Sequence, residues 1–419
     1  MVELKMVMRQ LGERARDAGC VLADASSEQK NAAISSAAAL IREHKDRLLA
    51  ANARDLAEAR RASLSEAMID RLSLDGDRIE SMATGLETIA KLPDPVGIVL
   101  CEWERPNGLR IERVSVPLGV IGIIYESRPN VTADAAALCI KSGNACILRS
   151  GSDSFEFSRA IGQCVRAGLW SSGLPQTAVQ LVPTADREAV GEMLTMTDFI
   201  NVIIPRGGGS LTKRVMEESR IPTIQHLDGN CHTYIHASAD VDMAASVLLN
   251  AKMRRTGICG ATESLLIDSS IAESVLPRLI STLLDAGCEV RGDWRVESID
   301  RRVKPAIEAD WSTEYLDSII SIKTVGGVDE AIDHINAYGS HHTDAIIAED
   351  DGAVERFLNG VDSAIVLHNA STQFADGGEF GMGAEIGIST GLLHARGPVG
   401  VEQLTTYKYL VRGNGQIRA

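Results

Sequence analysis

The pattern of apolar and polar positions divides the chain into a helical first part and two parts in which strands and helices alternate. Residues 1 to about 92 are rich in Ala, Glu and Arg, and the capping-box patterns Ser26-x-x-Gln29 and Ser63-x-x-Glu66 predict helices there. The segment 91–95 ends this part, because two prolines within three residues cannot continue a helix.

From about 110 to 230, short apolar runs alternate with helix candidates. Such alternation is typical of βαβ units, so we expect a mostly parallel sheet that is covered on both faces. The expected strands are 119–125, 145–149, 179–182, 199–204 and 223–227. The expected helices are 132–141, 154–171, 185–194 and 210–218.

A second alternating set follows and predicts a second α/β lobe. Its expected helices are 241–253, 271–286, 328–338 and 351–359, and its expected strands are 263–267, 318–325, 344–348 and 363–368. Two further strand-like segments are 109–116 and 405–411, whose edges would need to pair to hide their backbone groups.

Composition limits the class of protein. The chain has 419 residues, 45% of them hydrophobic, which is enough for a large core in two or three lobes. No apolar run approaches the ~20 residues that cross a bilayer, and the N-terminus lacks a signal-peptide core. The eight cysteines show no paired spacing, no Cys-x-x-Cys and no His/Cys cluster, which predicts reduced thiols and no zinc site. Together these features predict a cytoplasmic protein that does not bind membranes.

The net charge of −15 argues against a nucleic-acid partner. A small anionic ligand remains compatible with it, because a few arginines or backbone N–H groups can create a local positive pocket.

Cys259 is the strongest candidate for chemistry. It lies among small residues that leave its sulfur accessible, and Arg254 and Arg255 could favour the thiolate. A thiolate can take an acyl group from an activated carboxyl and hold it as a thioester. The alternative is that Cys259 is a buried small hydrophobic residue, as unpaired cysteines often are.

Three segments at strand ends could bind anions or stabilise an oxyanion. The loop Arg206–Ser210 contains three glycines that let backbone N–H groups approach a phosphate, although a simple tight turn would look the same. Arg149 follows an expected strand and could meet a ribose phosphate. Asn130 could donate to an oxyanion or cap the next helix, and Arg128 could pair with a carboxylate.

Several motifs agree in order with one known family. They are Val116–Gly122, Tyr125–Thr132, Ile204–Gly208, His394–Pro398 and Leu404–Lys408. On these motifs the chain resembles the gamma-glutamyl phosphate reductase (glutamate-5-semialdehyde dehydrogenase) family from about residue 10 to its C-terminus. More distantly, it is similar to the aldehyde dehydrogenase superfamily.

This resemblance implies an α/β, aldehyde-dehydrogenase-like fold with two doubly wound lobes and a small β oligomerisation arm. Residues 1–105 and 123–230, with part of 373–402, would form the cofactor-binding domain. Residues 231–372 would form the catalytic domain, and residues 106–122 and 403–419 the arm.

The implied reaction is the NADPH-dependent reduction of L-glutamate 5-phosphate to L-glutamate 5-semialdehyde and phosphate, the second step of proline biosynthesis from glutamate. Cys259 matches the nucleophile, and Asn130 matches the superfamily's oxyanion-hole Asn. The product would cyclise spontaneously to 1-pyrroline-5-carboxylate.

The resemblance also implies positions that contact NADPH/NADP. They are Arg149, Ser150, Gly151, Arg206, Gly207, Gly208, Gly209, Ser210 and Glu314. The superfamily usually has Lys where this chain has Arg149, and an arginine there would suit a 2′-phosphate. Glu314 resembles the glutamate that holds the nicotinamide ribose, although its neighbours match poorly.

One departure from the superfamily bears on the chemistry. Hydrolytic members carry Glu-Leu-Gly-Gly, whose Glu activates water, whereas this chain has His226–Asn230 at the matching place. A thioester enzyme without that carboxylate should exchange its acyl group with phosphate and avoid hydrolysis. His226 could act as a weak substitute for the missing base.

The substrate needs cations for a carboxylate and a phosphate, and an acceptor for an ammonium group. The candidates are Arg128, His394 and Arg396 for the anions, and Glu385 with the Asn369–Thr372 turn, including Ser371, for the ammonium. We expect a homo-oligomer, dimer or tetramer, that could contact glutamate 5-kinase.

Two alternatives remain at this point. One is another superfamily member that acts on a different aldehyde or acyl donor. The other is a cofactor-binding or redox-sensing protein that uses the thiol of Cys259 as a switch.

Overall fold

The computed structural model describes residues 2–128 and 130–418. Met1, Ala419 and Pro129, which belongs to one of the family motifs, lie outside the described residues. The chain forms two compact units. Unit 1 comprises residues 1–225, 381–387 and 399–419, and unit 2 comprises residues 226–380 and 388–398.

Unit 1 begins with the predicted helical part. Its helices are α1 (Val2–Ala23), α2 (Ser27–Glu43), α3 (Lys45–Arg61), α4 (Glu66–Leu72) and α5 (Gly76–Lys91). The capping box at Ser26 is confirmed: its hydroxyl accepts from the Gln29 N–H, and the Gln29 side-chain oxygen accepts from the Ser26 N–H. The box predicted at Ser63 is wrong: α4 begins later, and Ser65 caps it through the Met68 N–H.

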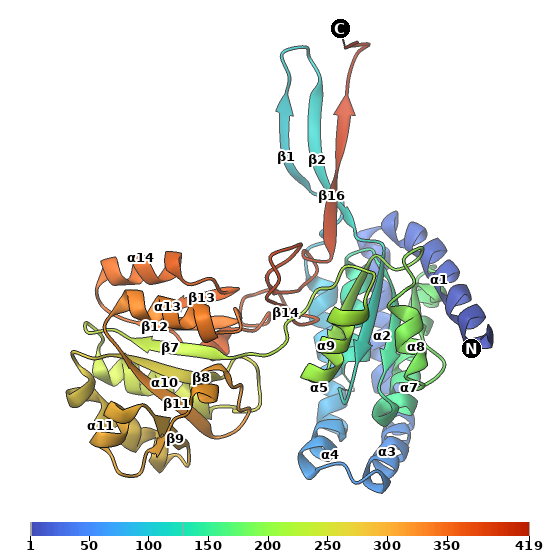
Figure 1. Ribbon diagram of the computed structural model, residues 1–419. Helices are drawn as coiled ribbons and strands as arrows, with labels where there is room; N and C mark the ends of the chain where they lie inside the picture. The colour runs from blue at the N-terminus through green and yellow to red at the C-terminus, as the bar shows by residue number, and fades with distance from the viewer. Residues whose placement is uncertain (1, 129, 419) are drawn as a thin grey trace. The chain divides into compact units, whose positions relative to one another are not determined.

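A four-stranded parallel sheet lies among the helices of unit 1 (Figure 1). Its strand order is β5-β4-β3-β6. Its strands are β3 (Val120–Tyr125), β4 (Ala145–Ser150), β5 (Val179–Leu181) and β6 (Val202–Arg206). They alternate with α6 (Val131–Lys141), α7 (Phe155–Ser171), α8 (Glu188–Met193) and α9 (Gly209–Glu218). Alternate residues of β3 enter two different hydrophobic clusters, so helices cover both faces as predicted.

Unit 2 contains a seven-stranded parallel sheet in the order β10-β9-β11-β8-β7-β12-β13. Its strands are β7 (Cys231–Ile235), β8 (Thr262–Asp268), β9 (Glu289–Gly292), β10 (Lys304–Pro305), β11 (Ile319–Val325), β12 (Thr343–Ile347) and β13 (Ile365–His368). Its helices are α10 (Val241–Met253), α11 (Ala272–Asp285), α12 (Trp294–Ile299), α13 (Val328–Tyr338) and α14 (Asp351–Gly360). Leu265 and Leu266 of β8 face different clusters, so this sheet too is packed on both sides.

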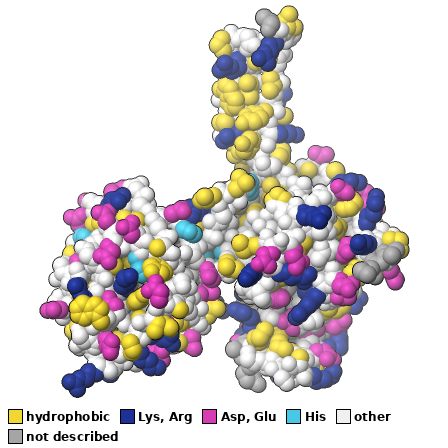
Figure 2. Space-filling view, viewed as in Figure 1, with side chains coloured by type: hydrophobic (Ala, Val, Ile, Leu, Met, Phe, Trp, Pro, Cys, Tyr) yellow, Lys and Arg dark blue, Asp and Glu magenta, His cyan; other side chains and the backbone are white. Residues whose placement is uncertain are grey.

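Three antiparallel strands of unit 1 form a separate sheet in the order β1-β2-β16. They are β1 (Val99–Glu104), β2 (Arg110–Pro117) and β16 (Thr405–Arg412). Hydrophobic side chains gather over these strands in Figure 2. The predicted arm, 106–122 with 403–419, differs at one end: β1 belongs to this sheet, whereas Val120–Gly122 lies in β3.

The α/β class with two doubly wound sheets is confirmed. One predicted strand, 223–227, is wrong, because only Thr223 makes an isolated bridge, to Ile203. Two short pairs, β9 with β10 and β14 (Ile388–Ser389) with β15 (Gly397–Pro398), have too few residues for a readable pattern. Within the described part of the chain, no helix is both long and apolar enough to cross a membrane.

Candidate active site

Cys259 lies in the loop between α10 and β8, and its side chain is half-buried. Its carbonyl oxygen accepts a hydrogen bond from the Cys231 thiol at 3.0 Å. Gly229 packs directly against its backbone, since a Cβ there would lie 2.1 Å from the Cys259 carbonyl oxygen. The neighbouring chain therefore fixes the backbone of the loop and leaves the sulfur partly accessible.

A buried ion pair joins the two elements that flank this loop. The Lys252 ammonium near the end of α10 donates to the Glu263 carboxylate at the start of β8, and both side chains are fully buried. Burial raises the pKa of Glu263 to about 7, against the opposing effect of Lys252. The pair holds both ends of the Cys259 loop at a fixed separation.

The arginines before Cys259 have structural partners. Arg254 donates to the Gln373 side-chain oxygen at 2.9 Å, and the Gln373 amide donates to the Arg255 carbonyl at 3.2 Å. Arg254 thus ties the loop to the segment after β13. Its expected effect on the Cys259 thiol stays a prediction.

Two histidines lie beside the thiol. One ligand atom each from His226, Cys259 and His342 lies within 4.8 Å of the others, and the two imidazoles meet edge to face at 5.1 Å between ring centroids. His342 is fully buried, and this burial lowers its pKa to about 3. Sequence reasoning missed this cluster, because its members are far apart in the chain and only the sheet of unit 2 brings them together.

Glu314 lies next to the same loop. Its carboxylate accepts from the Gly229 N–H at 2.9 Å, and burial raises its pKa. Glu314 is therefore linked through Gly229 to the Cys259 backbone. Its assignment to the nicotinamide ribose stays a prediction.

The segments of unit 1 that the sequence predicts to bind the cofactor meet at the carboxyl edge of one sheet. Arg149 and Ser150 end β4, Gly151 follows them, and Arg206 ends the strand β6. The Glu126 N–H donates to the Arg206 carbonyl at 3.1 Å, which joins the ends of β3 and β6. Ligands of open α/β sheets bind outside the carboxyl ends of the strands, so this edge is a reasonable cofactor site.

The glycine loop at this edge suits a close backbone approach. Gly208 occupies the N-cap position of α9, and Gly209 and Ser210 begin that helix. A Cβ at Gly208 or Gly209 would meet no atom within 4 Å, whereas one at Gly207 would lie 2.8 Å from the Glu126 carboxylate. Open space in front of a helix N-terminus is what a phosphate group needs.

Arg149 is mostly buried at the end of β4. Its guanidinium donates to the Ala185 carbonyl at 2.8 Å, and burial lowers its pKa. Nearby, the Ser127 hydroxyl donates to Asp153, which connects the segments after β3 and β4. This edge therefore combines the Arg149 and Arg206 side chains with two ordered loops.

Asn130 occupies the N-cap position of α6 without capping it. Its amide instead donates to the Asp134 carboxylate at 2.8 Å, and burial raises the pKa of Asp134 to about 6. Arg128, two residues earlier, is half-buried at the same end of β3.

The substrate candidates of the second half differ in their surroundings. The Asn369 side-chain oxygen accepts from the Ala348 N–H at 3.0 Å, and its side-chain N–H donates to the Ala348 carbonyl at 3.1 Å. Arg396 forms an ion pair with Asp362 at 2.7 Å. Ser371 caps a short 3-10 helix, Glu385 is half-buried, and His394 is exposed.

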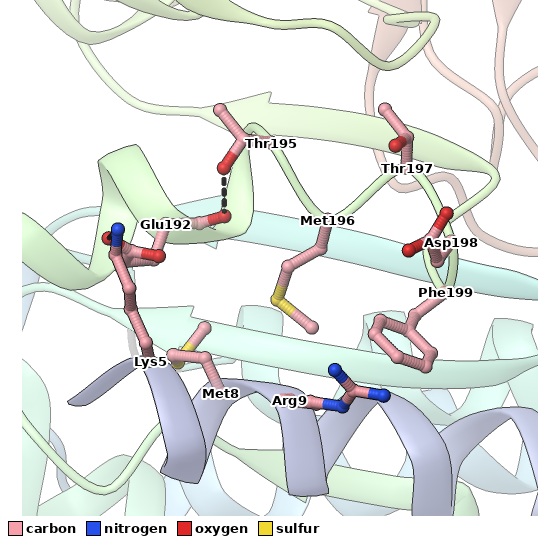
Figure 3. Close-up of a pocket in the computed structure, with 9 residues that line it drawn as sticks. All are labelled: Lys5, Met8, Arg9, Glu192, Thr195, Met196, Thr197, Asp198 and Phe199. Carbon is pink, nitrogen blue, oxygen red and sulfur yellow. Dashed lines mark hydrogen bonds and ion pairs between the residues drawn. The ribbon is translucent and has the colours of Figure 1, made fainter. Parts of the chain in front are cut away.

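A separate surface hollow of about 200 Å³ lies in unit 1 between α1 and the end of α8 (Figure 3). Lys5, Met8 and Arg9 face Met196 and Phe199 across it. It contains no residue predicted to act in catalysis or binding.

Comparison with known proteins adds to this geometry. The aldehyde dehydrogenase family matches residues 6–290. Gamma-glutamyl phosphate reductase of Paramagnetospirillum magneticum is 62% identical over 416 residues, which cover 99% of this chain and 98% of that protein. The crystal structure of gamma-glutamyl phosphate reductase from Thermotoga maritima superposes with a TM-score of 0.96 at 43% identity, covering 98% of this chain and 100% of that one.

A more distant structure shares the fold alone. An engineered glycolyl-CoA reductase with bound NADP⁺ matches with a TM-score of 0.67 at 16% identity. The match covers 97% of this chain and 96% of that chain.

Proposed function

The chain belongs to the aldehyde dehydrogenase family and, within it, to the gamma-glutamyl phosphate reductases, and from this membership we propose that it reduces L-glutamate 5-phosphate to L-glutamate 5-semialdehyde and phosphate. The observation that carries the proposal is near-full-length similarity to named relatives together with a half-buried thiol held in a constrained loop. In this role the protein would act in proline biosynthesis, and its product would cyclise to 1-pyrroline-5-carboxylate.

In the proposed mechanism the Cys259 thiolate attacks the acyl carbon of the substrate, and the acyl–oxygen bond breaks so that phosphate leaves. The resulting thioester accepts a hydride at its carbonyl carbon. The thiohemiacetal then collapses, releasing the aldehyde and the thiolate. We assign oxyanion stabilisation to the Asn130 amide and the Cys259 N–H.

The hydride would come from NADPH, which supplies it from its nicotinamide ring when bound. We assign its phosphates to the carboxyl edge of the unit 1 sheet, where the open Gly208–Gly209 loop and the buried Arg149 suit a phosphate-bearing ligand. Glu314 would contact the nicotinamide ribose. Unit 2 would carry the catalytic thiol.

Transfer to phosphate rather than to water follows from what surrounds the thiol. His226 stands where hydrolytic relatives carry their water-activating Glu, and its Nδ1 lies 2.7 Å from the Ile388 carbonyl oxygen. A carbonyl only accepts, so Nδ1 carries the proton and the ring is held in one orientation. Because the water-activating carboxylate of hydrolytic relatives is absent at this position, we expect the thioester to be hydrolysed slowly.

The test measures NADPH oxidation with L-glutamate 5-phosphate, and NADP⁺ reduction with L-glutamate 5-semialdehyde and phosphate. Cys259→Ala should lose all turnover in both directions, while Cys20→Ser, at an exposed thiol of α1, should keep it. If Cys231→Ala abolishes turnover while Cys259→Ala retains it, the wrong thiol has been chosen.

Substrate range distinguishes the alternatives. Faster turnover of simple aldehydes, or turnover independent of phosphate, would favour another superfamily activity. Absence of turnover with every acyl phosphate and aldehyde would favour a redox-sensing protein. We also propose a cytoplasmic location and a homo-oligomer, with glutamate 5-kinase as a possible contact to be tested by co-purification.

A further inference from the structure

We propose that Cys259, His226 and His342 form a binding site for a soft divalent metal ion, with Zn²⁺ as the preferred occupant, and that metal binding blocks the thiol. The proposed reaction uses no metal, so a metal bound at this site would inhibit turnover by blocking the Cys259 thiol. The binding itself stands on the geometry of unit 2; only the consequence for turnover rests on the proposed function.

The three ligand atoms lie close enough for one ion. Each lies within 4.8 Å of the other two. Tetrahedral zinc, with Zn–S near 2.3 Å and Zn–N near 2.0–2.1 Å, separates such atoms by about 3.4–3.6 Å. Closing the cluster therefore needs side-chain movements of roughly 1 Å, which two imidazoles and a loop cysteine can make.

Each of the two histidines has a hydrogen bond at one ring nitrogen and offers one ring nitrogen to the cluster. Nδ1 of His226 lies 2.7 Å from the Ile388 carbonyl, which fixes Nε2 as the acceptor nitrogen of the ring. Metal-binding histidines commonly donate their second ring N–H to a carbonyl in this way. Nδ1 of His342 lies 2.8 Å from the Thr343 hydroxyl.

The second nitrogen of His342 supplies an independent observation. Its Nε2 is buried and has no hydrogen-bond partner among the described residues, although the side chain is fully buried. A buried polar atom without a partner is costly, and a metal ion would satisfy it. The lone Nε2 thus points to a ligand that the protein itself does not provide.

The donor set selects the metal. One sulfur and two imidazole nitrogens suit Zn²⁺ and related soft ions, whereas Mg²⁺ and Ca²⁺ require oxygen ligands. On binding, the Cys259 S–H bond breaks, its proton passes to solvent, and a metal–sulfur bond forms. Three protein ligands leave one tetrahedral position for water.

Cys231 is not part of the donor set. Its thiol donates to the Cys259 carbonyl at 3.0 Å, and its sulfur lies 3.7 Å from Nδ1 of His342, not at the unpartnered Nε2. This separates the site from a two-sulfur centre and gives a useful control thiol.

The experiment titrates chelator-treated full-length protein with Co²⁺ and then displaces the ion with Zn²⁺. We expect one equivalent of Co²⁺ to give tetrahedral visible bands and a sulfur-to-cobalt charge-transfer band, both removed by Zn²⁺. Cys259→Ser should abolish the charge-transfer band. His226→Asn and His342→Asn should each weaken Zn²⁺ affinity at least about tenfold, measured by competition with a coloured chelator.

His341→Asn is the matched control, because His341 adjoins His342 in sequence but bonds the Asp362 carbonyl and lies outside the cluster. It should keep full Zn²⁺ affinity. Circular dichroism confirms that each variant is folded, and titration of reactive thiols confirms that its buried cysteines stay protected. Unchanged Zn²⁺ affinity in both His226→Asn and His342→Asn, or a cobalt spectrum without a sulfur band, overturns the proposal.

Turnover provides a separate readout. Zn²⁺ should inhibit the wild-type enzyme at one equivalent, and a chelator should restore the activity. If the protein shows no reductase activity at all, the cobalt spectrum still tests the metal site. A failure of the proposed function is therefore distinguishable from a failure of this inference.

Discussion

Asn130 lies at the N-cap position of α6, but its side chain does not cap the helix. The amide is exposed and donates to Asp134 in the first turn of the same helix. A capping residue would direct its side chain at the backbone, whereas this one is held by a carboxylate and keeps a second N–H for another acceptor. The orientation is compatible with an oxyanion donor.

Replacing Asn130 with Ala should slow turnover by about 100- to 1000-fold, the usual effect of losing one oxyanion-hole donor. Cofactor binding should change little, because the substituted amide would act only on the reacting carbonyl. Steady-state kinetics and NADPH fluorescence titration measure the two effects. Asp134→Asn, which keeps the Asn130 amide, is the control and should lose far less activity; equal losses in both variants would reject the oxyanion role.

Single residues differ in how far their surroundings can be read from sequence. Cys259 was identifiable because its small neighbours are adjacent in the chain, and the structure leaves its side chain half-buried as expected. His226 was singled out only through the resemblance, as a weak substitute for the missing base. His342 was not singled out, because β7 and β12 must pair before it approaches the thiol. The partners of Arg396 and Asn369 were likewise invisible, since Asp362 and Ala348 lie on other elements.

The Cys259 loop depends on the two elements that hold its ends. Lys252 and Glu263 are separated by that loop, and their ion pair is completely removed from water. Burying two charges is costly, so such a pair contributes less to stability than it costs to break. The main effect of the Lys252–Glu263 ion pair is on geometry, because it fixes where α10 ends relative to β8.

Glu263→Leu or Lys252→Met alone should lower the free energy of unfolding by about 3–5 kcal/mol, because each leaves an uncompensated charged partner inside the core. The double variant Lys252→Met/Glu263→Leu should recover most of this loss. Urea denaturation of the four proteins gives the coupling energy directly. Losses that simply add in the double variant would mean that the two side chains do not stabilise each other.

Most elements were predictable because their signals are local. The predicted helices 241–253 and 328–338 coincide with α10 and α13, since each combines an apolar face with clear flanking signals. β1 was missed because all six of its residues are exposed, so burial imposes no alternation on it. The segment 223–227 was wrongly taken as a strand: Ile224 is buried in a hydrophobic cluster, but Leu227 is exposed and only Thr223 makes a bridge.

At the scale of the whole molecule, the three-stranded sheet of unit 1 has two outer strands and an exposed apolar surface. β1 and β16 are the outer strands of the three-stranded sheet, and β2 lies between them. Trp103 and Tyr409 meet edge to face at 6.1 Å across β2, and Tyr407 lies beside Tyr409. All three side chains are exposed, Trp103 the least at 38%. Exposed strand edges with large apolar side chains are a liability for a monomer, which argues for a second copy as their cover.

The charge variant Tyr407→Glu/Tyr409→Glu should therefore shift the protein from an oligomer to a monomer. A glutamate on that face would have to be desolvated against the partner subunit, whereas the strands themselves stay paired within the chain. Light scattering coupled to size-exclusion chromatography measures the mass, and circular dichroism checks the fold.

Lys408→Glu, between the two tyrosines and on the opposite side of the strand, changes charge without touching the aromatic face and should remain oligomeric. A wild-type protein that is monomeric at micromolar concentration would contradict the assignment of this sheet, because its apolar face would then need no partner.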